Sequence, residues 1–150
     1  MNNNSANENY FGILADDLDF ENLITEKNEQ LFIRRILELL SEQKAEEIVF
    51  INVKSQTNIA DYLLICQGRS QLHCRSIAQN VEYNLKQAGE ISLGIEEERE
   101  GNWVLLDYGN VILHVFHPEI RKYYKLEELY LKKNFESNTQ NANPEKIKVV

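Results

Sequence analysis

The residues that could support catalysis gather first at Gly68-Arg69-Ser70, which follows an apolar run and precedes a helical pattern. Backbone amides at a helix start can bind a phosphate group, and a Gly-Ser turn of this kind serves nucleotidyl transfer. That chemistry also requires two carboxylates, usually as Asp-x-Asp, to hold Mg²⁺. The segment 79–83 that follows contains one acid, Glu82. We therefore interpret Gly68 as a turn and Ser70 as a helix cap, and a nucleotide-binding enzyme stays as the alternative.

The three histidines are the next candidates, because imidazole is a common metal ligand and general base. His114 and His117 lie three residues apart at the end of a predicted strand, so their side chains point to opposite faces. His73 begins a predicted helix, and the sequence has no HExxH or Cys-x-x-Cys motif. We predict no metal and no cofactor. With no nucleophile–base pair apparent either, we expect a binding protein rather than an enzyme.

Acidic residues dominate the charge, and they are unevenly distributed. The formal net charge is −8, and residues 1–26 hold six acids and no Lys or Arg. No basic stripe of the kind that direct DNA or RNA binding needs is present. The run Glu96-Glu-Glu-Arg-Glu100 is either a solvated strand end or a surface for a cationic partner. The composition therefore suits a basic protein partner better than a nucleic acid.

The segment 103–116 predicts a β-hairpin with two different faces, turning at Gly109-Asn110. Side chains alternate across each strand, which gives one nearly aliphatic face formed by Val104, Leu106, Tyr108, Val111, Leu113 and Val115. The other face mixes aromatic residues with an acid and an imidazole: Trp103, Leu105, Asp107, Ile112, His114 and Phe116. We expect the aliphatic face to enter the core. The mixed face must meet a second layer or a partner.

The remaining elements follow from apolar periodicity. Helices are predicted over 28–43 and 70–88, capped by Asn28 and Ser70. Strands are predicted over 48–53, 61–67 and 91–97, and a final helical section begins at Pro118. This order predicts an α/β (α+β) fold, in which a mixed five-stranded sheet carries its helices mainly on one face. Part of the other face is then expected to be uncovered.

The domain organisation follows from composition. Residues 1–27 form an acidic, Asn-rich extension predicted to be disordered, 28–133 form the folded domain, and 134–150 form a flexible C-terminal tail. No apolar run reaches the roughly 18–20 residues that cross a bilayer, and no secretory signal is visible. We therefore expect a cytoplasmic protein whose two cysteines, Cys66 and Cys74, are reduced thiols.

Four segments occur in the order and spacing of a known family: 60–70 (ADYLLICQGRS), 103–110 (WVLLDYGN), 114–116 (HVF) and 121–127 (RKYYKLE). From about Gln30 to Leu131 the chain closely resembles the ribosomal silencing factor (Iojap) family. The resemblance implies a nucleotidyltransferase-like topology without its catalytic carboxylates. It also implies a translational repressor that binds the large ribosomal subunit through its fourteenth protein. There it would block joining with the small subunit, especially under nutrient limitation.

The resemblance and the mixed face together predict the partner-binding residues, with Trp103 as the anchor: Trp103, Leu105, Asp107, Tyr108, His114, Phe116, Arg121, Tyr123 and Tyr124. Tyr and Arg are typical interface anchors, although one tyrosine of Arg121-Lys-Tyr-Tyr124 packing on the sheet explains that segment equally well. A homodimer that uses the same face stays open. The chain departs from the family pattern at Gln67 (usually Ser), Glu97 (Gly), Asn110 (Asp) and Tyr130 (Trp).

Overall fold

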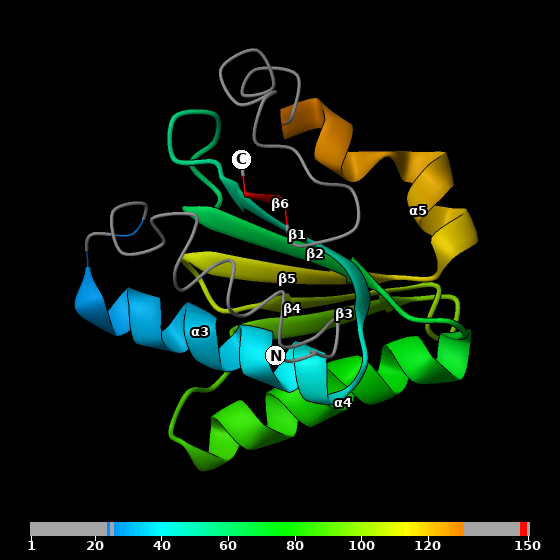
Figure 1. Ribbon diagram of the computed structural model, residues 1–150, viewed down its shortest axis with the longest axis horizontal. Helices are drawn as coiled ribbons and strands as arrows, with labels where there is room; N and C mark the ends of the chain where they lie inside the picture. The colour runs from blue at the N-terminus through cyan, green and yellow to red at the C-terminus, as the bar shows by residue number, and fades with distance from the viewer. Residues whose placement is uncertain (1–23, 25, 131–147, 150) are drawn as a thin grey trace, which may run out of the picture.

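The computed structural model describes residues 24, 26–130, 148 and 149. Its elements, shown in Figure 1, are α3 (Lys27–Glu42), β1 (Glu46–Asn52), β2 (Tyr62–Gln67), α4 (Gln71–Gln87), β3 (Gly94–Glu98), β4 (Trp103–Asp107), β5 (Val111–Phe116), α5 (Pro118–Tyr124) and β6 (Lys148–Val149). Helical turns resume after α5 at residues 126–130.

The sheet is mixed and has the strand order β3-β4-β5-β2-β1-β6. The β2–β5 and β1–β6 pairs are parallel, and the other pairs are antiparallel. The five predicted strands are all present, and the mixed α+β fold is confirmed. A two-residue sixth strand, Lys148–Val149, lies within the segment predicted as a tail and pairs with β1. The rest of that tail from residue 134 lies outside the described residues.

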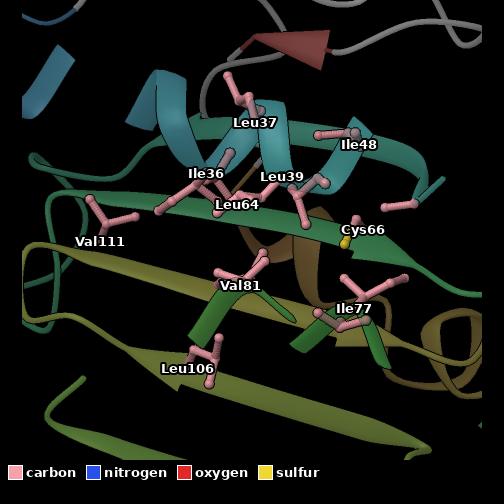
Figure 2. Close-up of a cluster of buried hydrophobic side chains, with 14 of the residues drawn as sticks. Ile36, Leu37, Leu39, Ile48, Leu64, Cys66, Ile77, Val81, Leu106 and Val111 are labelled. Carbon is pink, nitrogen blue, oxygen red and sulfur yellow. The ribbon is translucent and has the colours of Figure 1, made fainter. Parts of the chain in front are cut away.

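The main core lies between the sheet and the two long helices, α3 and α4 (Figure 1). Figure 2 shows side chains of both helices, such as Ile36 and Val81, meeting Leu64 of β2 and Leu106 of β4. The aliphatic face of the hairpin packs here as predicted. Each such buried side chain contributes about 1.5–3 kcal/mol, which makes this layer the principal source of stability.

A second apolar cluster fills the opposite face of the sheet, where Leu63, Ile65 and Phe116 are buried. It is covered by partly buried side chains from the hairpin, α5 and the helical turns at 126–130: Trp103, Leu105, Ile120, Leu126 and Tyr130. This second layer covers the centre of the face, whereas Glu96 of β3, on the same face, is exposed, so the expectation that part of this face is uncovered holds at the β3 edge. The sequence predicted that the mixed face of the hairpin meets either a second layer or a partner, and in the structure it meets a second layer.

The helix beginnings show which cap predictions hold. α3 begins at Lys27 because the Glu26 carboxylate accepts a hydrogen bond from the Glu29 N–H at 2.8 Å, so the prediction of Asn28 as the cap is wrong. Ser70 caps α4 as predicted and accepts from the His73 N–H at 3.0 Å. Gly68 precedes it because a Cβ there would lie 2.9 Å from the Cys74 nitrogen.

The folded body begins before residue 28. Ile24 is fully buried, and its carbonyl accepts a hydrogen bond from the side-chain amide of Gln30. Residues 1–23 and 25 of the predicted extension lie outside the described residues. Within the described part, no helix is both long and apolar enough to cross a membrane. Cys66 and Cys74 are buried free thiols, and burial raises the pKa of Cys66 to about 12.

The strand predicted over 91–97 differs most from the structure. β3 begins only at Gly94, and the apolar side chains of Ile91, Leu93 and Ile95 are exposed rather than buried. β3 occupies one edge of the sheet, and its partner among the described strands is β4. The alternation of apolar residues predicted a strand here correctly. It did not reveal that α4 leaves these apolar side chains exposed.

Candidate functional site

Trp103 is the centre of an aromatic cluster that we define as Trp103, His114, Phe116, Tyr123 and Tyr124. Trp103, the first residue of β4, stacks on Phe116 of β5 with 4.8 Å between the ring centroids, because the two residues are cross-strand partners. The ring of Tyr124, from the last turn of α5, lies 4.9 Å away on a tilted plane. The indole is therefore partly buried between the sheet and α5.

His114 fixes the orientation of the indole. Its Nδ1 accepts a hydrogen bond from the Trp103 Nε1–H at 3.0 Å, so the imidazole proton resides on Nε2. The side chain is buried, and burial lowers its pKa from 6.5 to about 4. His114 is consequently a neutral acceptor near pH 7. It positions Trp103 and is too buried to form much of a contact surface itself.

The exposed part of the aromatic cluster consists of two tyrosines. Tyr123 is 77% exposed and Tyr124 is 42% exposed, and their rings meet edge to face at 5.1 Å. The Tyr124 hydroxyl donates to Glu98 at 3.3 Å, and the negative charge of Glu98 raises the Tyr124 pKa. Beside the tyrosines lies a hollow of about 320 Å³, whose lining also includes Arg99, Asn102 and Ile120. An aromatic surface with a hollow and a polar rim is typical of a protein-binding site.

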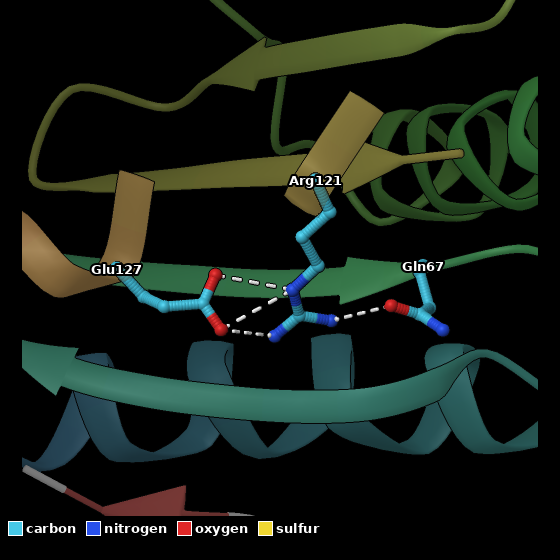
Figure 3. Close-up of polar contacts among 3 residues, drawn as sticks. All are labelled: Gln67, Arg121 and Glu127. Atoms are coloured by element: carbon cyan, nitrogen blue, oxygen red, sulfur yellow. Dashed lines mark hydrogen bonds and ion pairs between the residues drawn. The ribbon is translucent and has the colours of Figure 1, made fainter. Parts of the chain in front are cut away.

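Arg121 faces inward rather than toward a partner. Its guanidinium is buried and forms an ion pair with Glu127 at 2.8 Å. Arg121 also donates a hydrogen bond to the Gln67 side-chain oxygen at 3.2 Å (Figure 3). Because Arg121 lies on α5, Glu127 in the next helical segment and Gln67 at the end of β2, the three residues fasten the C-terminal helices to the sheet.

The remaining predicted contact residues do not join the aromatic cluster. Asp107 ends β4, about 13 Å along the strand from Trp103, and its carboxylate accepts from the Gly109 N–H in the hairpin turn. Tyr108 lies on the opposite face, against Phe32, and burial raises its pKa to about 12. Leu105 is partly buried in the second apolar cluster. The accessible surface is therefore smaller than predicted and centres on Tyr123 and Tyr124.

Four residues build this site without having been predicted to do so: Glu98, Ile120, Gln67 and Glu127. Glu98 belongs to the acidic run, which indicated a polar surface but not a tyrosine partner. Arg121 and Glu127 are six residues apart, a spacing that does not align on one helix. They meet only because Lys125 adopts a left-handed conformation with φ of 49° and breaks the helix between them.

The turn at Gly68-Arg69-Ser70 uses its polar groups internally. The Arg69 N–H donates to His73 Nδ1 at 2.9 Å, and the Ser70 hydroxyl accepts from the His73 N–H. The Arg69 and His73 amides therefore have partners within the chain. Within the described ranges, no group of three or more His, Cys, Asp or Glu side chains could hold a metal ion. The cap interpretation of Ser70 explains this segment.

The fold is that of a small α+β domain, and the aromatic surface is its candidate partner-binding site. The family model described as "Ribosomal silencing factor during starvation" matches residues 25–149. This chain belongs to the ribosomal silencing factor family, which makes it a ribosome-associated regulator of translation. The resemblance seen in the sequence is thereby confirmed.

Individual relatives agree with this assignment. Ribosomal silencing factor RsfS of Halalkalibacterium halodurans is 35% identical over 101 residues, which cover 67% of this chain and 86% of that protein. A crystal structure of a Chromobacterium violaceum protein superposes with a TM-score of 0.65 at 31% identity, covering 67% of this chain and 84% of that one. The mouse protein named "Mitochondrial assembly of ribosomal large subunit protein 1" is 27% identical over 69% of this chain and 47% of its own length.

Proposed function

We propose that this protein binds the large ribosomal subunit through its fourteenth protein and represses translation by blocking access of the small subunit. The observation that carries the proposal is the family match over residues 25–149, which includes both the aromatic cluster and the helices that hold it. The name of the mouse relative, which refers to the large ribosomal subunit, supports the choice of subunit. The proposal implies a cytoplasmic location and a need for repression when nutrients are scarce.

The aromatic cluster is the contact surface that we assign to this function. Tyr123 projects from α5 with most of its side chain accessible, whereas Trp103 and His114 hold Tyr124 from beneath. Tyrosine supplies a large contact area at low conformational entropy cost. Steric blocking also needs no catalytic group, since a bound domain excludes the small subunit by its volume alone.

Subunit joining measured on a density gradient tests the function directly. The purified full chain is mixed with large and small subunits, and the fraction of joined ribosomes is quantified as protein concentration rises. We expect joining to fall in a saturable manner, with the protein migrating with the large subunit. Undiminished joining at saturating protein would refute the mechanism. Migration with the small subunit would refute the assigned partner.

A matched pair of tyrosine variants tests the surface. Tyr123→Ala is expected to weaken binding to the large subunit by about 1–2 kcal/mol, roughly tenfold, without loss of stability. Tyr83→Ala on α4 is the control, because Tyr83 is 63% exposed and α4 covers the other face of the sheet. Sedimentation of the free protein shows whether a homodimer competes for this surface. Equal binding by both variants would remove Tyr123 from the interface.

A further inference from the structure

The outer edge of β3 has no strand paired with it among the residues that the structure describes. Among the strands that the structure describes, β3 pairs with β4 alone and ends the strand order. Every residue from Gly94 to Glu97 is exposed. In an antiparallel edge strand, alternate residues direct their N–H and C=O groups outward, where another strand can pair with them.

Apolar side chains accompany this open edge. Ile91, Leu93 and Ile95 are 68%, 75% and 47% exposed, although large aliphatic side chains at alternate positions normally pack in a core. Next to Ile95 lies a groove of about 200 Å³ between α4 and the sheet edge. Its lining includes Val104 and Leu106 of β4, so an apolar side chain placed there would contact apolar atoms.

Negative charge lies on both faces of the same edge. Residues 90–100 contain five glutamates and one arginine. Glu97 pairs across the sheet with Val104 and therefore lies on the α4 side, where it forms an ion pair with Arg75 at 3.1 Å. Glu96 pairs with Leu105 and lies on the opposite side. A strand added at this edge would meet glutamates whichever way its side chains point.

We propose that the β3 edge and its groove receive an extended, basic segment of another protein, which joins the sheet as an additional strand. Lysine or arginine side chains of that segment would face the glutamates of β3, and an apolar side chain between them would enter the groove beside Ile95. Backbone pairing supplies affinity, and the alternating side chains supply specificity. This site centres on Ile95 and adjoins the aromatic cluster only at Glu98, the last residue of β3. The proposal does not depend on the proposed ribosomal function.

The charges also disfavour the simplest competitor, a second copy of this chain, in the register that aligns the glutamates. Two β3 strands paired antiparallel through Glu96 would place glutamates opposite one another, and like charges across a strand pair are destabilising. A cationic strand turns the same positions into attractive contacts. The edge therefore discriminates by charge between self-association and a basic partner.

Titration of the isotopically labelled full chain with a short peptide of alternating valine and lysine tests the proposal. We expect saturable amide shifts and slower hydrogen exchange confined to β3 and its groove, with affinity that falls as salt rises. One control peptide carries glutamate in place of lysine, and another has alternate backbone amides methylated. Equal binding of either control, or protection at a different strand, would overturn strand addition at β3.

Two charge-reversal variants separate this site from general attraction to an acidic protein. Glu96→Lys is expected to weaken peptide binding at least about tenfold, whereas Glu42→Lys, an exposed residue at the end of α3, changes the net charge equally and should bind as the parent does. Equal affinities would mean that the peptide senses only net charge. A dimer that Ile95→Lys dissociates would identify a second copy as the occupant, contrary to the proposal.

Discussion

Acidification is expected to destabilise this protein through one residue, His114. Its imidazole accepts the Trp103 indole hydrogen bond within a buried site, and burial lowers its pKa from 6.5 to about 4. The unfolded chain therefore binds a proton at a higher pH than the folded one. Stability is fully present above about pH 6.5 and is lost progressively as the pH falls toward about 4, because protons then favour the unfolded state.

The size of the effect follows from the two pKa values. Each tenfold difference in proton affinity between the unfolded and folded states corresponds to about 1.4 kcal/mol, so the complete loss is about 3 kcal/mol below pH 4. At about pH 5 the unfolded imidazole is almost fully protonated and the folded one is almost fully neutral, which costs about 2 kcal/mol. That is a large part of the roughly 5–15 kcal/mol stability of an ordinary domain.

Urea unfolding at about pH 7.5 and about pH 5 measures this difference, and the single tryptophan, Trp103, reports it by fluorescence. The matched variant is His114→Asn, whose side-chain oxygen keeps an acceptor for the indole but does not titrate in this range. Comparing the two proteins cancels the contribution of the carboxylates. The reasoning is refuted if both lose the same free energy between the two pH values.

Two further predictions concern polar pairs in the interior. Arg121→Met should lower the free energy of unfolding in urea by about 2 kcal/mol, because Glu127 and Gln67 lose their cation. Adding Glu127→Leu should recover most of that loss, and no recovery would contradict the ion-pair explanation. Asn110→Asp should cost about 1 kcal/mol in thermal unfolding at neutral pH, since the Asn110 amide donates to the Glu29 carboxylate. Glu29→Gln should rescue that variant, and an unaltered melting temperature of Asn110→Asp alone would disprove the pairing.

The hairpin shows how much of this fold can be predicted from sequence. Alternation assigned the strand residues on either side of the Gly109-Asn110 turn to the correct face, because the period of a strand is fixed by its backbone. The turn was equally predictable: Gly109 has φ of +89°, as the first central position of a type II′ turn requires. Local rules of this kind depend only on neighbouring residues, and they hold here.

The accessible surface was less predictable, because accessibility depends on segments distant in sequence. The residue types of Phe116 and His114 suggested a binding face, but α5 and the helical turns after it cover both side chains. The position of α5 depends in turn on Arg121 meeting Glu127 across the break at Lys125 and Gln67 from β2. Spacing carries no signal for such a contact, so the predicted interface was larger than the exposed one.

The residues that we interpret as departures from the family pattern have partners within this chain. Gln67 stands where serine is usual, and its longer side chain reaches Arg121. Glu97 stands in place of glycine and pairs with Arg75. The polar side chains of Gln67 and Glu97 therefore each have a complementary partner within contact distance, as buried and partly buried polar groups usually do.

Asn110 and Tyr130 fit the same explanation. An aspartate at position 110 would face the carboxylate of Glu29, whereas the asparagine amide donates to it. Tyr130 packs on the second apolar cluster, where the usual tryptophan would also bury an aromatic ring. Gln67 and Tyr130 belong to the packing that holds α5 and the turns after it, whereas Glu97 and Asn110 lie elsewhere. None of the four replaces Tyr123 or Tyr124, the two side chains that the surface exposes. Substitutions that restore the family residue singly should therefore change stability before they change binding.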